Sequence, residues 1–162
     1  MSDLQWDEVK DFFDPGLVGA LPDVFVPDAS ADDWQTVFDM VKARGWQWEF
    51  RLGGVMSPMP LATEALVRSA DAELAELRVW PVPGVLVIFR LVVAEEIDFD
   101  IDLRELQGQA GVDILCGFLA EIGRELKKPV LMTPEGGNRA HPVLGYDPVL
   151  NRVVLLANPL FR

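Results

Sequence analysis

The sequence predicts one α+β domain in which a mostly antiparallel sheet packs against two main helices, at about residues 31–44 and 109–127. Strand patterns arrive in clusters with only two long helical patterns between them, which favours α+β over a doubly wound parallel sheet. No repeat, low-complexity run or linker divides the 162 residues, so we interpret 1–162 as a single domain. Half of the residues are hydrophobic, which is ample for a core.

Residues 1–29 are expected to form an acidic, partly irregular N-terminal arm. Apolar residues at one-sided helical spacing predict a short helix within it: Trp6, Val9, Phe12 and Phe13. We expect Pro15-Gly16 to end this helix. Residues 21–27 are expected to be extended, because a proline disfavours helix at the residue before it.

The helix at about 31–44 has clear boundary signals in the sequence. Ser30 can cap it, Asp33 completes a capping-box pattern, and Asp32 suits the positive end of the helix dipole. Gly45 is the expected stop. One apolar stripe runs between these limits: Trp34, Val37, Phe38 and Val41.

Four strands are expected between the two helices, at residues 46–52, 74–80, 85–92 and 97–103. In 46–52 the side-chain pattern changes to a period of two, as in a half-buried strand. The segment 85–92 is apolar almost throughout, so we expect it to be buried on both faces. Between the first two strands, 55–73 is expected to be an extended loop with a short helix near 64–72, capped by Thr63.

The helix at 109–127 is the longest, and Pro129 prevents its continuation. Its apolar stripe has the spacing of one helix face: Leu115, Phe118, Leu119, Ile122 and Leu126. Gly117 and Gly123 lie inside it, where each glycine costs about 1 kcal/mol relative to alanine. Close packing against a strand is the expected reason for both.

A short strand at 130–133 and a hairpin that pairs 143–146 with 152–157 are expected to end the chain. The elements together predict a shared core, made of Trp34, Phe38, Trp48, Phe50, Phe89, Phe99, Phe118 and Ile122.

The net charge of −12 argues against direct binding to nucleic acid or to an anionic membrane. The acid is concentrated, because residues 1–39 carry ten acids and one base for a net charge of −9. The acidic N-terminus is unlike a signal peptide, and no stretch approaches the ~20 apolar residues of a membrane span. We expect a cytoplasmic protein, and a composition with four lysines against ten arginines suggests a bacterial source.

The most unusual segment is 96–103, in which acids alternate with apolar residues. As a strand it would place Glu96, Asp98, Asp100 and Asp102 on one face, with neighbouring carboxylates about 6.5–7 Å apart at the Cα atoms. Three interpretations remain open: an exposed edge or open sheet face protected from stray pairing, a docking stripe for a basic partner, or a divalent-cation site. Arg104 follows directly and can neutralise part of this charge.

Other candidate chemistry is weak. The loop 133–141 is polar and holds Glu135, Asn138 and His141, so an acid–base pair is possible, although a plain connecting loop explains these residues equally well. Cys116 comes directly after Leu115, the first residue of the apolar stripe, and is expected to be a buried, inert thiol. One histidine and one cysteine exclude a standard zinc cage, and no phosphate-binding motif is present. We expect no cofactor, no metal site and no catalytic residue.

The favoured hypothesis is an acidic protein-binding module, of the inhibitor or immunity type, that covers a basic partner surface. Its expected contact residues are Glu96, Asp98, Asp100, Asp102, Asp32 and Asp33. The alternative is a small enzyme or divalent-cation-dependent protein that uses the 96–102 carboxylates with Glu135 or His141. The gene neighbourhood and a divalent-ion titration would separate the two.

Overall fold

The structure, a computed structural model, describes residues 3–67 and 73–157, and it confirms the predicted α+β fold class. One sheet of nine strands has the order β3-β2-β4-β5-β6-β1-β7-β8-β9, and every neighbouring pair is antiparallel. The strands are β1 (Asp23–Val26), β2 (Gln47–Leu52), β3 (Val55–Ser57), β4 (Ala75–Val82), β5 (Val85–Arg90), β6 (Ile97–Ile101), β7 (Val130–Thr133), β8 (Leu144–Asp147) and β9 (Arg152–Leu155). The helical segments are α1 (Trp6–Val9), η1 (Lys10–Phe13), α2 (Pro15–Val18), α3 (Ala31–Ala43), α4 (Ala62–Leu66), η2 (Leu103–Glu105) and α5 (Gly108–Leu126).

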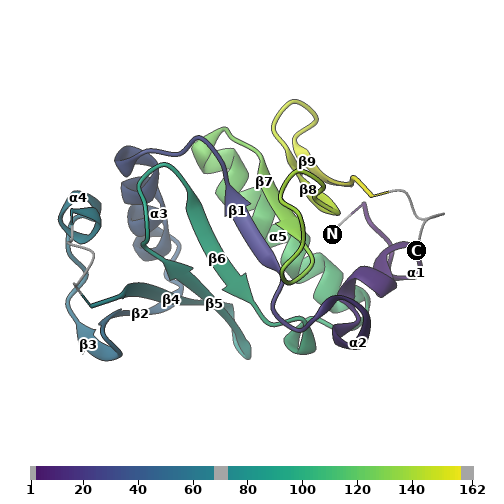
Figure 1. Cartoon of the computed structure of the whole chain (residues 1–162), viewed down its shortest axis with the longest axis horizontal. Coiled ribbons are helices and arrows are strands. Elements are labelled where there is room, and N and C mark those ends of the chain that lie inside the picture. The colour runs from purple at the N-terminus through teal and green to yellow at the C-terminus, as the bar shows by residue number, and fades with distance from the viewer. Residues whose placement is uncertain (1–2, 68–72, 158–162) are drawn as a thin grey trace.

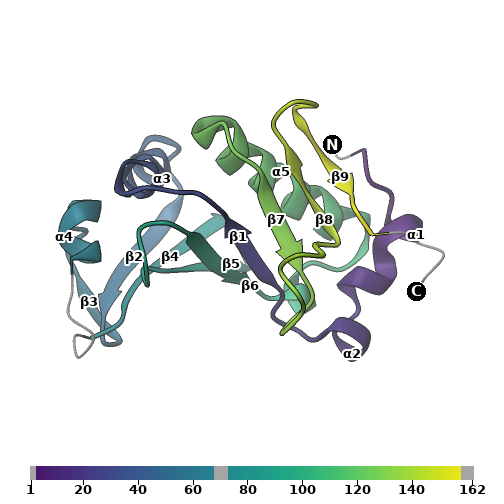
Figure 2. The same ribbon diagram turned by 45° about the horizontal axis from the view of Figure 1, so that its top comes forward.

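The fold has two layers. Figures 1 and 2 show α3 and α5 side by side on one face of the sheet, with the N-terminal helices at its far end. In the described part of the chain, no helix lies over the opposite face of β4, β5 and β6 (Figure 1). We name the helix-covered side the inner face and the opposite side the outer face.

The core fills the space between the helices and the inner face. Seven of the eight residues predicted to share it are at most 4% exposed and belong to one cluster, and the exception is Trp48. The rings of Phe89 and Phe99 lie 4.8 Å apart, and that of Phe118 on α5 lies 5.7 Å from Phe99. Trp48 is only half-buried, because it lies toward the sheet margin with the Lys42 ammonium 6.0 Å from its ring.

Both main helices have the predicted limits. The Ser30 hydroxyl caps α3 by accepting a hydrogen bond from the backbone N–H of Asp33 at 3.2 Å. Helix α5 ends at Leu126, and the capping residue Lys127 takes a left-handed conformation with φ 58°.

The two glycines inside α5 have different surroundings. A Cβ on Gly123 would lie closer than 3.0 Å to the ring of Tyr146, so close packing explains this glycine. A Cβ on Gly117 would meet nothing within 4 Å, so the same interpretation is wrong for Gly117.

The N-terminal segment is more ordered than the sequence predicts. The predicted helix ends at Phe13, just before Pro15-Gly16, but a further short helix follows: Pro15 begins α2, and the Asp14 carboxylate accepts a hydrogen bond from the N–H of Gly16 at 2.8 Å. A proline at the first position of a helix loses no hydrogen bond. The extended segment 21–27 contains β1, which lies between β6 and β7 in the middle of the sheet.

The region between β2 and β4 also departs from the prediction. Residues 55–57 pair with β2 as the edge strand β3, where an extended loop was expected. Helix α4 begins at Ala62 and not after a Thr63 cap, and residues 68–72 of the predicted helix lie outside the described residues. Strand β5 is fully buried on its inner face alone, because its outward side chains, Leu86, Ile88 and Arg90, are partly exposed.

Candidate functional site: the acidic face of the sheet

Strand β6 carries its carboxylates on the outer face, as its alternation predicts. Ile97, Phe99 and Ile101 are at most 1% exposed on the inner face. Asp98 and Asp100 between them point outward and are partly exposed. The strand pairs with β5 on one side and β1 on the other, so β6 is an internal strand and its carboxylates lie on the open face of the sheet and not at its edge.

Strand β1 adds a fifth carboxylate to this surface. Asp23 lies opposite Asp100 in the β1–β6 register, on the outer face. The sequence indicated no link between these residues, because strand pairing over so many residues leaves no local pattern. The acidic face of the protein consists of these five residues: Asp23, Glu96, Asp98, Asp100 and Asp102.

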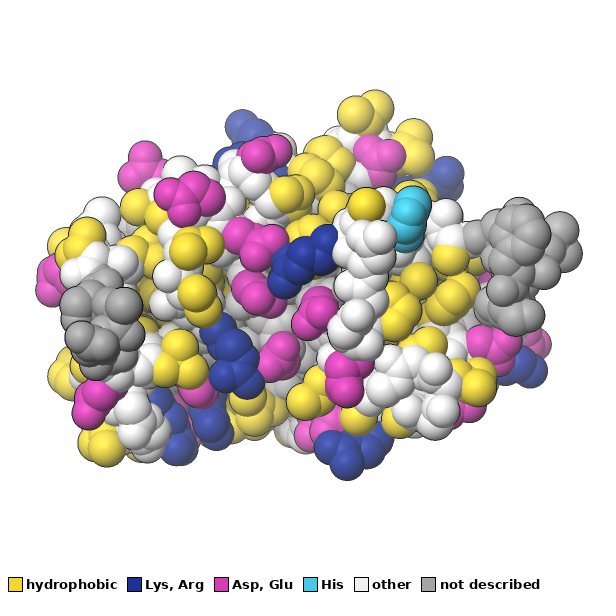
Figure 3. Space-filling model, viewed as in Figure 1, with side chains coloured by type: hydrophobic (Ala, Val, Ile, Leu, Met, Phe, Trp, Pro, Cys, Tyr) yellow, Lys and Arg dark blue, Asp and Glu magenta, His cyan; other side chains and the backbone are white. Residues whose placement is uncertain are grey.

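Three arginines neutralise part of the acidic face. Arg90 on β5 binds Asp100 with an N···O distance of 2.8 Å. Arg104 binds Asp102 at 2.8 Å, as expected from its position just after the strand. Arg139 forms ion pairs with Glu96 and, at 3.5 Å, with Asp98. The acidic face therefore holds five carboxylates and three guanidinium groups. Figure 3 shows acidic side chains together with basic ones in the middle of the outer face.

The neighbouring strands β2 and β4 are closer to charge balance. Arg51 binds Glu49 with an N···O distance of 2.7 Å, and Arg78 lies 3.5 Å from Glu76. Across β2, β4, β5 and β6, one row of opposed positions alternates in sign, from Arg51 through Glu76 and Arg90 to Asp98. The excess of negative charge on the outer face is therefore concentrated on β6 and β1.

Two carboxyl groups of the acidic face have shifted pKa values in opposite directions. Burial raises the pKa of Asp98, and Arg139 only partly opposes this because Glu96, Asp100 and Asp23 add their repulsion. Hydrogen bonds from Arg104 lower the pKa of Asp102. The acidic face therefore contains one partly desolvated carboxylate, Asp98, and one carboxylate whose charged form is stabilised, Asp102.

The loop after β7 folds back onto the sheet through Arg139. The guanidinium carbon lies 4.4 Å from the centre of the Phe25 ring, an outer-face residue of β1 that is only 4% exposed. A cation over an aromatic face and two carboxylates together stabilise this arrangement. Arg139 was not among the expected site residues, since only the folded loop brings it to β1 and β6.

The three loop candidates make separate contacts in the structure. Glu135 accepts a hydrogen bond from the backbone N–H of Leu21 at 2.8 Å and so fixes the segment before β1. Asn138 accepts a hydrogen bond from the N–H of Ala140 at 2.8 Å, which shapes the turn. His141 is exposed, and no hydrogen bond or ion pair between described residues joins it to Glu135.

Asp32 and Asp33 lie at the start of α3, near the Glu96 end of the acidic face. The N–H of Ala29 donates to the Glu95 carbonyl at 2.8 Å, which holds this helix start beside β6. Asp33 forms an ion pair with Lys128, whereas Asp32 is exposed. Asp32 is therefore the more accessible of the two predicted contact residues.

Over residues 3–67 and 73–157, no group of three or more His, Cys, Asp or Glu side chains is placed to hold a metal ion. Cys116 is 4% exposed on α5, in agreement with a buried thiol. Within the same described ranges, no helix combines the length and the apolar character needed to cross a membrane.

The fold and the site define a two-layer α+β protein with a partly neutralised acidic sheet face that no helix of the described residues covers. Neither a protein-family model nor a curated protein nor a solved structure matches the chain.

Proposed function

We propose that this chain is an acidic protein-binding module whose outer sheet face covers a basic surface of another protein, as an inhibitor or immunity-type protein does. The observation that supports this most is the acidic face itself, where five carboxylates lie beside three arginines on a surface that no helix in the described part of the chain covers. The proposal includes the bacterial cytoplasm suggested by the composition.

The physical properties of such a face suit rapid binding to a basic partner. Concentrated negative charge steers a positive surface during diffusion and raises the association rate constant. Asp23, Asp98 and Asp100 are carried by paired strands, so their backbone positions are fixed before binding. A preorganised surface loses less conformational entropy on association than a flexible loop does.

The outer face also offers apolar contact beside the charge. A hollow of about 270 Å³ lies over β7, β8 and β9, with Leu131, Val154 and Leu156 among its lining. Leu131 lies opposite Phe25, and Phe25 lies opposite Asp98, so the apolar and acidic parts share one row of the sheet. Interfaces commonly combine an apolar centre with a charged rim.

The first test is capture of the partner from the native cell with the tagged protein, followed by kinetics on the captured protein. We expect a basic partner whose association slows as NaCl rises from roughly 50 to 500 mM, because the Debye length falls with ionic strength. A captured partner that is itself acidic, or an association rate indifferent to salt, would contradict the proposal.

The alternative is a small enzyme or divalent-cation-dependent protein that uses the 96–102 carboxylates with Glu135 or His141. In the part of the chain that the structure describes, these groups do not converge on one point, so no specific observation favours it.

A further inference from the structure

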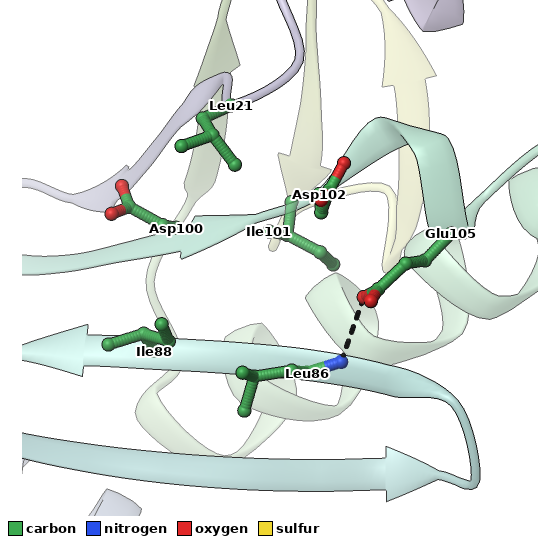
Figure 4. A pocket seen from close by; sticks show the side chains of 7 residues that line it. All are labelled: Leu21, Leu86, Ile88, Asp100, Ile101, Asp102 and Glu105. Atoms are coloured by element: carbon green, nitrogen blue, oxygen red, sulfur yellow. Dashed lines mark hydrogen bonds between the residues drawn. The ribbon is translucent and has the colours of Figure 1, made fainter.

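A small hollow opens on the outer face where β6 ends (Figure 4). Its volume is about 120 Å³. Residues from β5, β6, η2 and the segment before β1 line it: Leu21, Leu86, Ile88, Asp100, Ile101, Asp102 and Glu105.

The wall of the hollow is mainly apolar. Leu86 and Ile88 are successive outward side chains of β5, and Leu21 faces them from the other side (Figure 4). The N–H of Leu21 donates to Glu135 at 2.8 Å, so the loop after β7 holds this side of the hollow in place. An apolar wall of this kind can receive the aliphatic part of a side chain.

Three carboxylates stand at the rim, and two of them keep an oxygen available. Asp100 receives both bonds from Arg90 on Oδ2, at 2.9 Å from Nε and 2.8 Å from Nη2, and Oδ1 accepts no hydrogen bond from the described residues. Glu105 accepts the N–H of Leu86 on Oε1 at 3.1 Å, and its Oε2 likewise has no donor in the described structure. Both oxygens of Asp102 are occupied by Arg104.

This combination discriminates between occupants by charge. An anionic group would be repelled by the rim, and a purely apolar side chain would cover the carboxylates without pairing them, which is costly. A long cationic side chain satisfies both parts, since lysine and arginine lay an apolar stem on an apolar surface and keep the charged head at its edge. A second copy of this chain is disfavoured by its own net charge of −12.

We propose that an arginine or lysine side chain of the basic partner inserts into this hollow, with its stem against Leu86 and Ile88 and its charged head at Asp100 and Glu105. This inference rests on the proposed function and specifies the anchor by which the partner is recognised. Anchors that fill a pocket at an interface typically dominate its binding energy.

The experiment uses the full chain and a short glycine-spaced arginine peptide as the probe. Amide and methyl NMR spectra of the labelled protein are recorded as the peptide is added at constant ionic strength. A peptide with citrulline in place of each arginine has nearly the same shape without the charge and serves as the ligand control. A lysine peptide tests whether the ammonium head is accepted as well.

Two protein variants separate the hollow from the general charge. Asp100→Asn/Glu105→Gln removes the charges of two of the three rim carboxylates, those that keep an oxygen available, while the amide oxygens can still accept from Arg90 and Leu86. Glu64→Gln/Glu125→Gln removes the same charge from α4 and α5, away from the hollow. Thermal melts of both variants check that the fold is retained.

We expect saturable shifts at Leu21, Leu86 and Ile88 with the arginine peptide and none with the citrulline peptide. The rim variant should weaken this binding by roughly tenfold, since charge-assisted hydrogen bonds are lost, and the control variant should leave it nearly unchanged. Chemical-shift changes that spread over the whole outer face and are equal in both variants would contradict binding in the hollow, while they would leave the proposed function in place. The absence of any shift on the outer face would go against both.

Discussion

The two glycines of α5 provide a matched test of the structure, because they share one helix and differ in what surrounds them. Replacing either one with alanine gains about 1 kcal/mol of helix propensity. At Gly117 nothing opposes this gain, because the new Cβ meets no atom within 4 Å. Gly117→Ala should therefore stabilise the protein by about 1 kcal/mol, which raises the melting temperature by about 2–4 °C for a chain of this length.

At Gly123 the same substitution inserts a methyl group into Tyr146. The ring of Tyr146 is 3% exposed, and its hydroxyl donates to Asn151 at 2.7 Å, so it has little freedom to move. Overpacking of this kind costs about 1–3 kcal/mol, which offsets or exceeds the gain in propensity. Gly123→Ala should therefore be neutral to destabilising by about 2 kcal/mol.

Urea unfolding followed by tryptophan fluorescence measures both variants, with the midpoint compared at a constant m value. We expect the midpoint to rise for Gly117→Ala and to stay level or fall for Gly123→Ala. Equal destabilisation by the two substitutions would refute the reasoning, because it would mean that other atoms pack closely against Gly117 as they do against Gly123.

Three further outcomes follow from the structure. Phe118→Ala should destabilise the protein by about 3–5 kcal/mol in the same urea assay, and a loss below about 1 kcal/mol would show that α5 is misplaced. In a carboxyl ¹³C titration Asp98 should protonate above, and Asp102 below, the ordinary value near 3.8. The stability that Asp102 contributes should be lost as pH falls through its lowered pKa. Asp98 instead opposes folding when charged, so Asp98→Asn should stabilise the protein above the raised pKa of Asp98. Thermal melts recorded at decreasing pH should show this stabilisation disappear near pH 3.8. Millimolar Ca²⁺ or Mn²⁺ should not raise the melting temperature beyond an equal ionic strength of NaCl, and a metal-specific rise of several degrees that Asp98→Asn/Asp100→Asn abolishes would favour the cation-dependent alternative.

Local patterns predicted most helices and strands because each has a short-range physical cause. The Ser30 cap, the stripe of α5 and the alternation in β6 all depend on residues within one or two turns or a single strand. The short edge strand β3 was missed, although Gly53-Gly54 after an alternating strand is itself a hairpin signal.

The order of the strands could not be predicted in the same way. The placement of β1 beside β6 and β7 depends on contacts between residues 71 or more positions apart in the sequence, from the pairing of Val26 with Ile97 upward. The carboxylates of β6 were identified correctly from alternation alone. Their partners Arg90 and Arg139 were not, because neighbouring strands and a folded loop bring them there.

The acidic face can be neutralised without a large expected loss of stability. Asp98, Asp100 and Asp102 are each paired with an arginine whose side chain is at least 36% exposed. The gain expected from Asp98→Asn and the loss expected from Asp102→Asn have opposite signs, so the triple substitution should change the net stability little. The triple substitution to Asn is therefore a suitable probe of binding.

The central claim is that the acidic face makes the contact with a basic partner. The most direct test is the association rate constant of Asp98→Asn/Asp100→Asn/Asp102→Asn with the captured partner, beside a control, Glu64→Gln/Glu121→Gln/Glu125→Gln, that loses the same charge elsewhere. We expect the acidic-face variant to associate at least roughly tenfold more slowly at low salt and to dissociate at a similar rate, since exposed charges act mainly on encounter. Equal association rates for the two variants would show that the acidic face is not the contact surface.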